Sequence, residues 1–321
     1  MGFSKQVKNE ILNTKDISKQ ECLAFLCGLV YSSADFEIEN LKIKNCTITS
    51  EVENLSQALN KYIQIVFNKD VILTEKESFK IGKMQYYTIN LDSDFAKILL
   101  KNTKKILKIN SDYQINEKVD DSVLSDELGL KGFMRGAYIG CGTSSIKLDE
   151  KNRTTTGYHL EFNNKSYTLL HEISEILAQF DIIAKLTKRK NLYVLYIKDA
   201  EQVSNMLALM GASEAVLNLQ NEIITRQMRN KINRQNNCYT SNYTKTLDAS
   251  FNQLEAIKII DKEIGVYNLP EDLCQVALLR LANTEESLDQ LLKLSKMPLT
   301  KSALNYKFQK LIKLSKKFRR D

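Results

Sequence analysis

A set of small residues occurs twice in this 321-residue chain, and it restricts the folds that the chain can adopt. Positions 24 and 132, 28 and 136, and 32 and 140 are each separated by 108 residues. The six residues are Ala24, Gly28, Ser32, Gly132, Gly136 and Gly140. Residues four apart lie on one face of a helix, and a face of small residues lets a second helix approach almost backbone to backbone. The matched spacing predicts a tandem duplication whose halves cross through these helices; two unrelated glycine-containing helices are the alternative.

Length and charge indicate a soluble chain with more than one domain. A length of 321 residues favours two domains, and 43% hydrophobic residues are enough to form cores. The net charge of +7 and the pI of about 8.9 favour an acidic partner such as nucleic acid. Residues 1–12 lack the apolar stretch of a signal peptide, and the longest apolar stretch, 23–31, is too short to span a bilayer. We therefore expect a cytoplasmic protein without membrane contact.

The cysteines and histidines do not predict a metal site. The six cysteines are scattered without a Cys-x-x-Cys pair, and the only histidines are His159 and His171. Free buried thiols are the ordinary state of such cysteines. We expect neither a metal nor another cofactor.

The order of predicted elements repeats along the first two thirds of the chain. Ser18 and Glu21 form a capping-box pattern at the start of the first small-residue helix. In the first half we expect helices at 3–12, 18–33, 51–67 and 95–109, and strands within 35–49 and at 71–74 and 84–91, followed by a polar connector at 110–126. In the second half we expect helices at 127–140, 166–180 and 200–210, strands at 144–148, 158–162, 182–187 and 192–197, and a flexible tip at 149–157.

This order predicts an α+β fold with three regions. They are a duplicated domain at 1–212 with repeats at about 1–109 and 127–212, a helical connector at 213–265, and a C-terminal domain at 266–321. The connector has almost no β signal, and its centre is rich in arginine and asparagine. Such a segment, including Arg229 and Arg234, can bind phosphates, because arginine supplies charge and asparagine supplies hydrogen-bonding groups. The alternative is a solvated linker helix.

The last fifty residues predict a helix-turn-helix. Helices are expected at 271–281 and 287–294, and Thr300 is a suitable N-cap for a third helix that runs to about 317. The third helix is expected to bury Leu304, Phe308, Leu311 and Ile312. Its exposed residues are expected to contact DNA, with base contacts near its start and backbone contacts from the basic tail. The predicted DNA-binding residues of this helix are Lys301, Ser302, Asn305, Tyr306, Lys307, Gln309, Lys310 and Lys313. A three-helix protein-interaction bundle is the alternative.

The two small-residue helices resemble the crossing helices of LAGLIDADG homing endonucleases. LCGLVYSSA (26–34) and MRGAYIGCG (134–142) align with the nine-residue motif of that family. In the nucleases the eighth motif position is acidic, and the two carboxylates hold divalent metal. Here those positions are Ser33 and Cys141, and a hydroxyl and a thiol do not replace two carboxylates as ligands for Mg²⁺. Asp35 has Thr143 as its counterpart in the second repeat, so no symmetric acidic pair is restored. The resemblance therefore implies an αββαββα scaffold, twice over, without catalytic acids.

The whole chain resembles the WhiA family of bacterial regulators, in which such a domain precedes a helix-turn-helix. The stretches that carry the resemblance are GFMRGAYIGCG (132–142), GYHLEF (157–162), the basic and amide residues between 229 and 246, Leu269-Pro270, LLRL (278–281) and LTKSALN (299–305). Cys141 departs from a common glycine, and Tyr306-Lys307 departs from the usual His-Arg. The resemblance implies a transcriptional regulator of cell division, chromosome segregation or sporulation that binds double-stranded DNA, is associated with the nucleoid and has RNA polymerase or another transcription factor as a further partner. The base preference and the oligomeric state stay open.

Two other hypotheses compete with a non-enzymatic DNA-binding regulator. The first is a scaffold that binds a transcription or division factor through the former DNA-binding saddle. The second is a homing endonuclease, which Mg²⁺-dependent cleavage of plasmid DNA would reveal.

Overall fold

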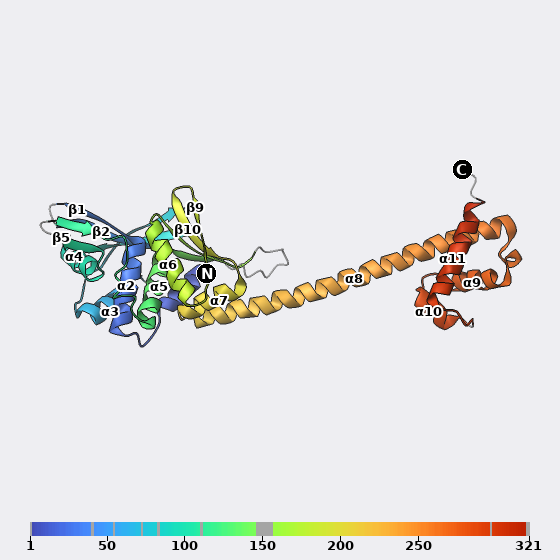
Figure 1. Ribbon diagram of the computed structural model, residues 1–321, viewed down its shortest axis with the longest axis horizontal. Helices are drawn as coiled ribbons and strands as arrows, with labels where there is room; N and C mark the ends of the chain where they lie inside the picture. The colour runs from blue at the N-terminus through green and yellow to red at the C-terminus, as the bar shows by residue number, and fades with distance from the viewer. Residues whose placement is uncertain are drawn as a thin grey trace. The chain divides into compact units, whose positions relative to one another are not determined.

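The computed structural model describes residues 2–39, 42–53, 55–71, 73–81, 84–109, 112–145, 157–295 and 297–318. The chain divides into two compact units, Met1–Thr225 and Arg226–Asp321 (Figure 1). Each unit has its own cluster of buried apolar residues. No helix in the described ranges is long and apolar enough to cross a bilayer.

The first unit consists of two halves that share the order helix, two strands, helix, two strands, helix, and the first half has a further helix before this order and a further hairpin after it. The first half contains α1 (Phe3–Leu12), α2 (Lys19–Ser33), β1 (Ala34–Glu39), β2 (Lys42–Ser50), α3 (Leu55–Phe67), β3 (Thr74–Ile81), β4 (Met84–Leu91), α4 (Ser93–Asn102), β5 (Ile106–Ile109) and β6 (Asp112–Ile115). The second half contains α5 (Glu127–Cys141), β7 (Gly142–Ser145), β8 (His159–Asn164), α6 (Tyr167–Gln179), β9 (Lys185–Arg189), β10 (Leu192–Ile197) and α7 (Ala200–Leu209).

The sheet topology confirms the predicted duplication. Each half has an antiparallel four-stranded sheet, in the order β1-β2-β4-β3 in the first half and β7-β8-β10-β9 in the second. In both sheets the first strand of the half lies at one edge and its third strand lies at the other edge. The α+β class predicted from the sequence is therefore confirmed.

The crossing of α2 and α5 holds the two halves together at the centre of the first unit (Figure 1). A methyl group added to Gly28 would lie 2.1 Å from the carbonyl oxygen of Phe133, and one added to Gly136 would lie 2.0 Å from that of Phe25. A methyl group added to Gly140 would lie 2.0 Å from the hydroxyl of Ser32. Contacts this short leave no room for a side chain, so glycine is required where the two backbones meet.

Helix ends follow local sequence signals. The predicted capping box at the start of α2 is present, with the Ser18 hydroxyl accepting from the Glu21 amide and the Glu21 carboxylate accepting from the Ser18 amide. After α7, Gly211 has a φ of 78°, a left-handed conformation in which glycine ends helices without strain.

Several predicted segments of the first unit are wrong in part, and the helix predicted at 51–67 begins only at Leu55. The helix predicted at 95–109 ends at Asn102, because Lys104 takes a positive φ of 57° and the chain then enters the β5–β6 hairpin. That hairpin extends into the predicted connector at 110–126. The strand predicted at 71–74 lies at Thr74–Ile81 instead, and the apolar Val71 and Leu73 pack against the core without strand pairing. The strand predicted at 182–187 begins only at Lys185.

The strand predicted at 144–148 is also shifted. β7 covers Gly142–Ser145, and the remainder of the predicted strand falls on residues that the structure does not describe. The predicted tip at 149–157 lies outside the described residues except for Gly157.

The second unit contains four helices and a short 3-10 turn in its described residues. The long helix α8 (Ser213–Ile264) begins in the first unit and ends in the second, where it is followed by η1 (Val266–Asn268), α9 (Glu271–Ala282), α10 (Leu288–Leu294) and α11 (Lys301–Lys316). The core of this unit joins Ile257 and Ile260 of α8 to Val276 of α9 and to Leu304 and Phe308 of α11. The predicted cap at the start of α11 is present, because the Thr300 hydroxyl accepts from the Ala303 amide.

Candidate nucleic-acid interface

Helix α11 has one buried face and one exposed polar face. Leu304, Phe308 and Leu311 are at most 1% exposed and anchor the helix in the core of the second unit, whereas the fourth predicted core residue, Ile312, is only partly buried. The exposed residues of the opposite face include Lys301, Ser302, Asn305, Tyr306, Gln309, Lys310 and Lys313. They follow one another at spacings of three and four residues, so they form one continuous surface over several turns.

Two lysines of α11 are held by carboxylates of the neighbouring helices. The Lys301 ammonium pairs with Asp289 of α10, and the Lys307 ammonium pairs with Asp272 of α9. The side chain of Lys307 is only 17% exposed. The hydrogen bond from Lys307 lowers the pKa of the Asp272 carboxyl, so this carboxyl is ionised at neutral pH. Lys307 is therefore the least available of the residues predicted to contact DNA.

The remaining charges of α11 lie on a solvent-exposed surface. Tyr306 is 63% exposed, and the Lys310 ammonium lies 4.9 Å from the centre of its ring. The predicted basic tail is described as far as residue 318, so Arg319 and Arg320 lie outside the described residues.

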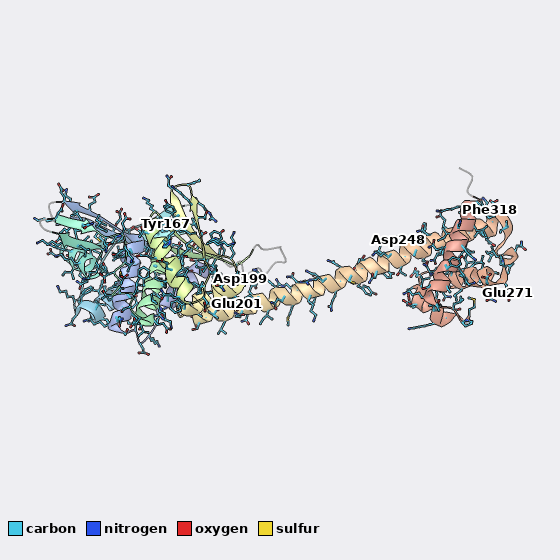
Figure 2. All side chains as sticks on the ribbon, viewed as in Figure 1. Tyr167, Asp199, Glu201, Asp248, Glu271 and Phe318 are labelled. Atoms are coloured by element: carbon cyan, nitrogen blue, oxygen red, sulfur yellow. The ribbon has the colours of Figure 1, made fainter. Side chains whose placement is uncertain are left out.

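The arginine- and asparagine-rich part of α8 is exposed. Every residue from 227 to 245 is exposed, and Figure 2 shows side chains projecting from this stretch of the helix. Arg229 and Arg234 make no ion pair with any residue that the structure describes. Their guanidinium groups are therefore available to an anionic partner.

The ends of α2 and α5 carry the positions at which the resembled nucleases hold metal. Ser33 and Cys141 line a cavity of about 320 Å³ there. The Ser33 hydroxyl donates to the carbonyl oxygen of Leu29 at 2.9 Å. Burial raises the pKa of the Cys141 thiol to about 12, so the thiol is neutral at physiological pH. Neither side chain offers an anionic ligand.

A buried lysine lines the same cavity. Lys8 of α1 is 2% exposed, and its ammonium lies 3.8 Å from the Glu51 carboxylate and 5.8 Å from the centre of the Tyr138 ring. Burial lowers the pKa of Lys8, and the charge of Glu51 opposes that shift. Glu51 is the one carboxylate among the lining residues of this cavity, and no group of three or more metal-binding side chains occurs in the described ranges. The residues at this place do not fit a divalent metal.

The open faces of the two sheets both combine acidic and basic residues. On β1, Asp35, Glu37 and Glu39 are exposed while the alternate residues pack against the core, and Glu39 pairs with Lys44 of β2. On the second sheet, the Glu161 carboxylate contacts His159 at 2.7 Å and Arg189 at 3.4 Å. Burial opposes ionisation of Glu161, but hydrogen bonds from Asn163 and His159 prevail and lower its pKa.

Comparison with known proteins identifies the family of this chain. The sequence models described as the WhiA LAGLIDADG-like domain and the WhiA C-terminal HTH domain match residues 130–229 and 232–315. A relative from Clostridium acetobutylicum, named "Probable cell division protein WhiA", is 33% identical over 323 residues, covering 100% of this chain and 99% of the relative. The chain belongs to the WhiA family. A WhiA relative from Clostridium perfringens is also 33% identical and covers 99% of both chains.

A solved structure agrees with this assignment at the level of the fold. The crystal structure of full-length WhiA from Thermotoga maritima covers 100% of both chains with a TM-score of 0.57 and 24% identity. The predicted fold, a LAGLIDADG-like duplicated domain followed by a helix-turn-helix, is therefore confirmed.

Sequence reasoning missed three residues that shape these sites. Lys8 and Glu51 belong to elements that are distant in sequence from the small-residue helices, so no local pattern connected them to Ser33. Arg280 is 1% exposed although it is charged, and its position within the apolar run LLRL was the available signal.

Proposed function

We propose that this WhiA-family protein is a non-enzymatic transcriptional regulator that binds specific sites on double-stranded DNA through α11. The observation that carries the proposal is the exposed face of α11, which combines amide, hydroxyl and lysine side chains on a helix fixed by a buried apolar face. Asparagine can read adenine with two hydrogen bonds in the major groove, and lysines contact phosphates. Asn305 is the proposed base-reading residue, with Ser302, Tyr306 and Gln309 beside it.

In this proposal each of the three regions of the chain has a separate role. Residues 266–321 recognise sequence, residues 213–265 add phosphate contacts through Arg229 and Arg234, and residues 1–212 supply the scaffold. The relatives are named probable cell division proteins, which supports a role in cell division, and regulation of chromosome segregation or sporulation is part of the same proposal. A nucleoid-associated protein in the cytoplasm fits this role, and RNA polymerase or another transcription factor is the proposed protein partner.

The absence of nuclease activity is proposed from the cavity at the ends of α2 and α5. Phosphodiester cleavage by this fold needs divalent metal held by carboxylates. The cavity has a neutral thiol at Cys141, a hydroxyl at Ser33 and the buried amine of Lys8, whose pKa is lowered, and none of these three side chains is an anionic ligand. Incubation of the full chain with supercoiled plasmid and Mg²⁺ or Mn²⁺ should give no nicked or linear product. Cleavage that disappears in Asp35→Asn would overturn this part of the proposal.

Genome-wide mapping of bound DNA tests the main proposal. Bound sites should share a sequence, and the same map for Asn305→Ala should lose those sites while the protein stays folded. A map without shared sequence, or one that is unchanged by Asn305→Ala, would move recognition away from α11.

The first unit favours a protein partner over DNA as a second function. Asp35 and Glu37 project from the edge strand of its first sheet beside Glu39, which pairs with Lys44 of the next strand, and carboxylates repel phosphates. A pull-down with Asp35, Glu37 and Glu39 changed to Asn or Gln should lose a protein partner without losing DNA binding. Stronger DNA binding by that variant with no loss of any partner would argue that the open faces of the two sheets contact DNA.

A further inference from the structure

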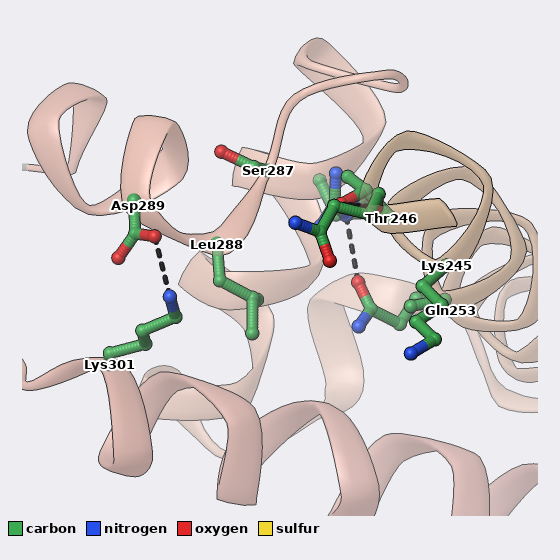
Figure 3. Close-up of a pocket in the computed structure, with 10 residues that line it drawn as sticks. Lys245, Thr246, Gln253, Ser287, Leu288, Asp289 and Lys301 are labelled. Atoms are coloured by element: carbon green, nitrogen blue, oxygen red, sulfur yellow. Dashed lines mark hydrogen bonds and ion pairs between the residues drawn. The ribbon is translucent and has the colours of Figure 1, made fainter. Parts of the chain in front are cut away.

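The second unit contains a polar cavity that borders the start of α11. The cavity measures about 460 Å³ and is lined by α8, by α9, by the start of α10 and by Lys301 (Figure 3). In Figure 3, Lys245, Thr246 and Gln253 stand on the side of α8, and the Lys301–Asp289 pair stands on the opposite side. A cavity of this size exceeds the needs of one ordered water and is within the range of ligand pockets.

Arg280 lines this cavity and is a buried cation without a carboxylate partner. Its side chain is 1% exposed. Its Nε donates to the Gln253 side-chain oxygen at 2.9 Å, and its Nη1 donates to the carbonyl oxygens of Asn283 and Glu286 at 3.2 and 2.7 Å. No carboxylate within the described ranges lies at ion-pair distance from the guanidinium. Taking a charged group out of water without a counter-charge is costly, so the site favours an anion.

The arginine keeps donors for such an anion. An arginine has five N–H groups, and its second amino group, Nη2, makes no hydrogen bond with another described residue. Burial lowers the pKa of Arg280, and the charge of Glu286 opposes this shift, but the guanidinium stays protonated at neutral pH.

The other lining groups have the chemistry of a phosphate site. Lys245 is exposed on α8 and makes no ion pair in the described part of the chain. Asn242, Thr246 and Ser287 add amide and hydroxyl groups. Asp289 is the one carboxylate among the lining residues, and Lys301 already neutralises it. Three cations against one carboxylate give the lining a net positive charge, while Glu285 and Glu286 line the adjoining pocket.

We propose that this cavity binds a phosphate group, with Lys245 and the Nη2 amino group of Arg280 as its charged partners. The proposal rests on the proposed function where the phosphate belongs to the backbone of DNA held by α11, because Lys301 lies both in the cavity lining and at the exposed start of that helix. A small phosphorylated molecule such as a nucleotide has the same chemistry, and the experiment separates these two sources.

The experiment compares two lysines of the same helix in the full chain. Lys245→Ala removes a cavity cation, and Lys258→Ala removes an exposed lysine of α8 that does not line the cavity. Each variant is titrated with a random-sequence DNA duplex at several salt concentrations, and with ATP and inorganic phosphate by calorimetry. Asp289→Asn is added because it removes the one carboxylate of the lining and should strengthen phosphate binding.

The two sources give different results. For a DNA phosphate, Lys245→Ala should weaken duplex binding about tenfold and lower the salt slope by about one, whereas Lys258→Ala should change neither. For a small phosphorylated ligand, ATP or phosphate should bind the unaltered chain and lose about tenfold in affinity in Lys245→Ala, with duplex binding unchanged. In either case Asp289→Asn should bind more tightly.

Equal behaviour of Lys245→Ala and Lys258→Ala with every probe would overturn the cavity as a phosphate site. Retention of the Asn305→Ala effect in that case would leave the proposed function standing. Failure of the unaltered chain to bind any duplex would instead overturn the proposed function, while the ATP and phosphate titrations would still test the cavity.

Discussion

Individual residues of α11 divide between anchoring the helix and facing solvent. Leu304 and Phe308 are fully buried, and Asn305 between them is exposed. The sequence predicted this division, because an apolar residue at every third or fourth position defines the buried face of a helix. It could not predict that Lys307 pairs with Asp272, since that aspartate lies 35 residues away and only the packing of α9 on α11 brings the two together.

Asn305→Ala should lower affinity for a cognate DNA site by about 1–3 kcal/mol and leave affinity for random DNA almost unchanged, because a base contact is lost. Lys313→Ala should weaken both complexes about equally, because it removes a phosphate contact. Fluorescence anisotropy with cognate and random duplexes measures both effects. Equal losses on the two duplexes in folded Asn305→Ala would assign base recognition to other residues.

The pH dependence of stability should reveal the energetic effect of the buried Glu172. This carboxylate is 6% exposed and accepts from the Val119 amide, yet burial prevails and raises its pKa. A raised pKa means that the folded state favours the protonated form, so ionisation of Glu172 lowers stability above its folded pKa. Below the unfolded pKa, near 4, both states are protonated and the penalty vanishes.

Glu172→Gln should therefore raise the Tm of the first unit at pH 7, by a change on the order of 2 °C, since glutamine keeps an acceptor for Val119. The difference between the two proteins should shrink as the pH falls toward 4. Glu37→Gln, on the exposed face of β1 and away from Glu172, serves as the control. A stabilisation that grows at low pH would contradict this account.

At the scale of helices and strands, the sequence predicted those elements whose residue spacing matches the way in which they pack in the structure. The crossing helices were predicted because small residues recur in register in two helices, at Gly28 and Gly136 among others, and close approach is the simplest reason for glycine in a helix interior. The helix at 95–109 was overextended because Ile106 and Ile109 fit a helical spacing as well as they fit a strand. The helix ends before the positive φ of Lys104, and the Tyr31 hydroxyl donates a hydrogen bond to the Lys104 carbonyl oxygen. These two residues are 73 positions apart, so no local pattern predicted the contact.

Gly136→Leu should destabilise the first unit by about 3 kcal/mol or more, because its side chain would overlap the backbone of α2 and force the helices apart. Thermal and urea unfolding measure the loss. Gly2→Leu is the matched control, since a side chain at Gly2 would meet nothing within 4 Å. A neutral effect of Gly136→Leu would contradict the close crossing.

Across the whole molecule, the two units have separate apolar cores. One core includes Phe133 and Leu170, and the other includes Ile260 and Leu304. The sequence predicted a change of character after residue 212 because β signals cease there, but the exact limits of the regions, at 212 and 265, stay predictions.

Separate cores should unfold separately. Leu304→Ala removes fully buried apolar volume from the second unit and should destabilise that unit by about 2–5 kcal/mol. In differential scanning calorimetry the transition of the second unit should move to lower temperature, and the transition that Gly136→Leu affects should stay in place. A shift of all unfolding to lower temperature as one cooperative transition would show that the units are coupled.

The exposed arginines of α8 should contribute to DNA binding without sequence preference. Replacement of Arg229 and Arg234 by alanine should weaken binding to every duplex and lower the salt slope by about one for each lost phosphate contact. Anisotropy titrations at several salt concentrations measure the slope. A loss confined to one cognate site would instead make α8 part of base recognition.

The fit of Ser32 against Gly140 makes two distant codons dependent on each other. A methyl group at position 140 would lie 2.0 Å from the Ser32 hydroxyl and 3.0 Å from the Ser33 hydroxyl, so a larger residue there requires these side chains to give way. The order of mutation therefore matters: loss of the Ser32 side chain before a change at Gly140 removes the closest of these contacts, whereas the reverse order meets it in full. Duplication allowed the two halves to diverge in sequence, but the contact between positions 32 and 140 still couples later substitutions in one half to those in the other.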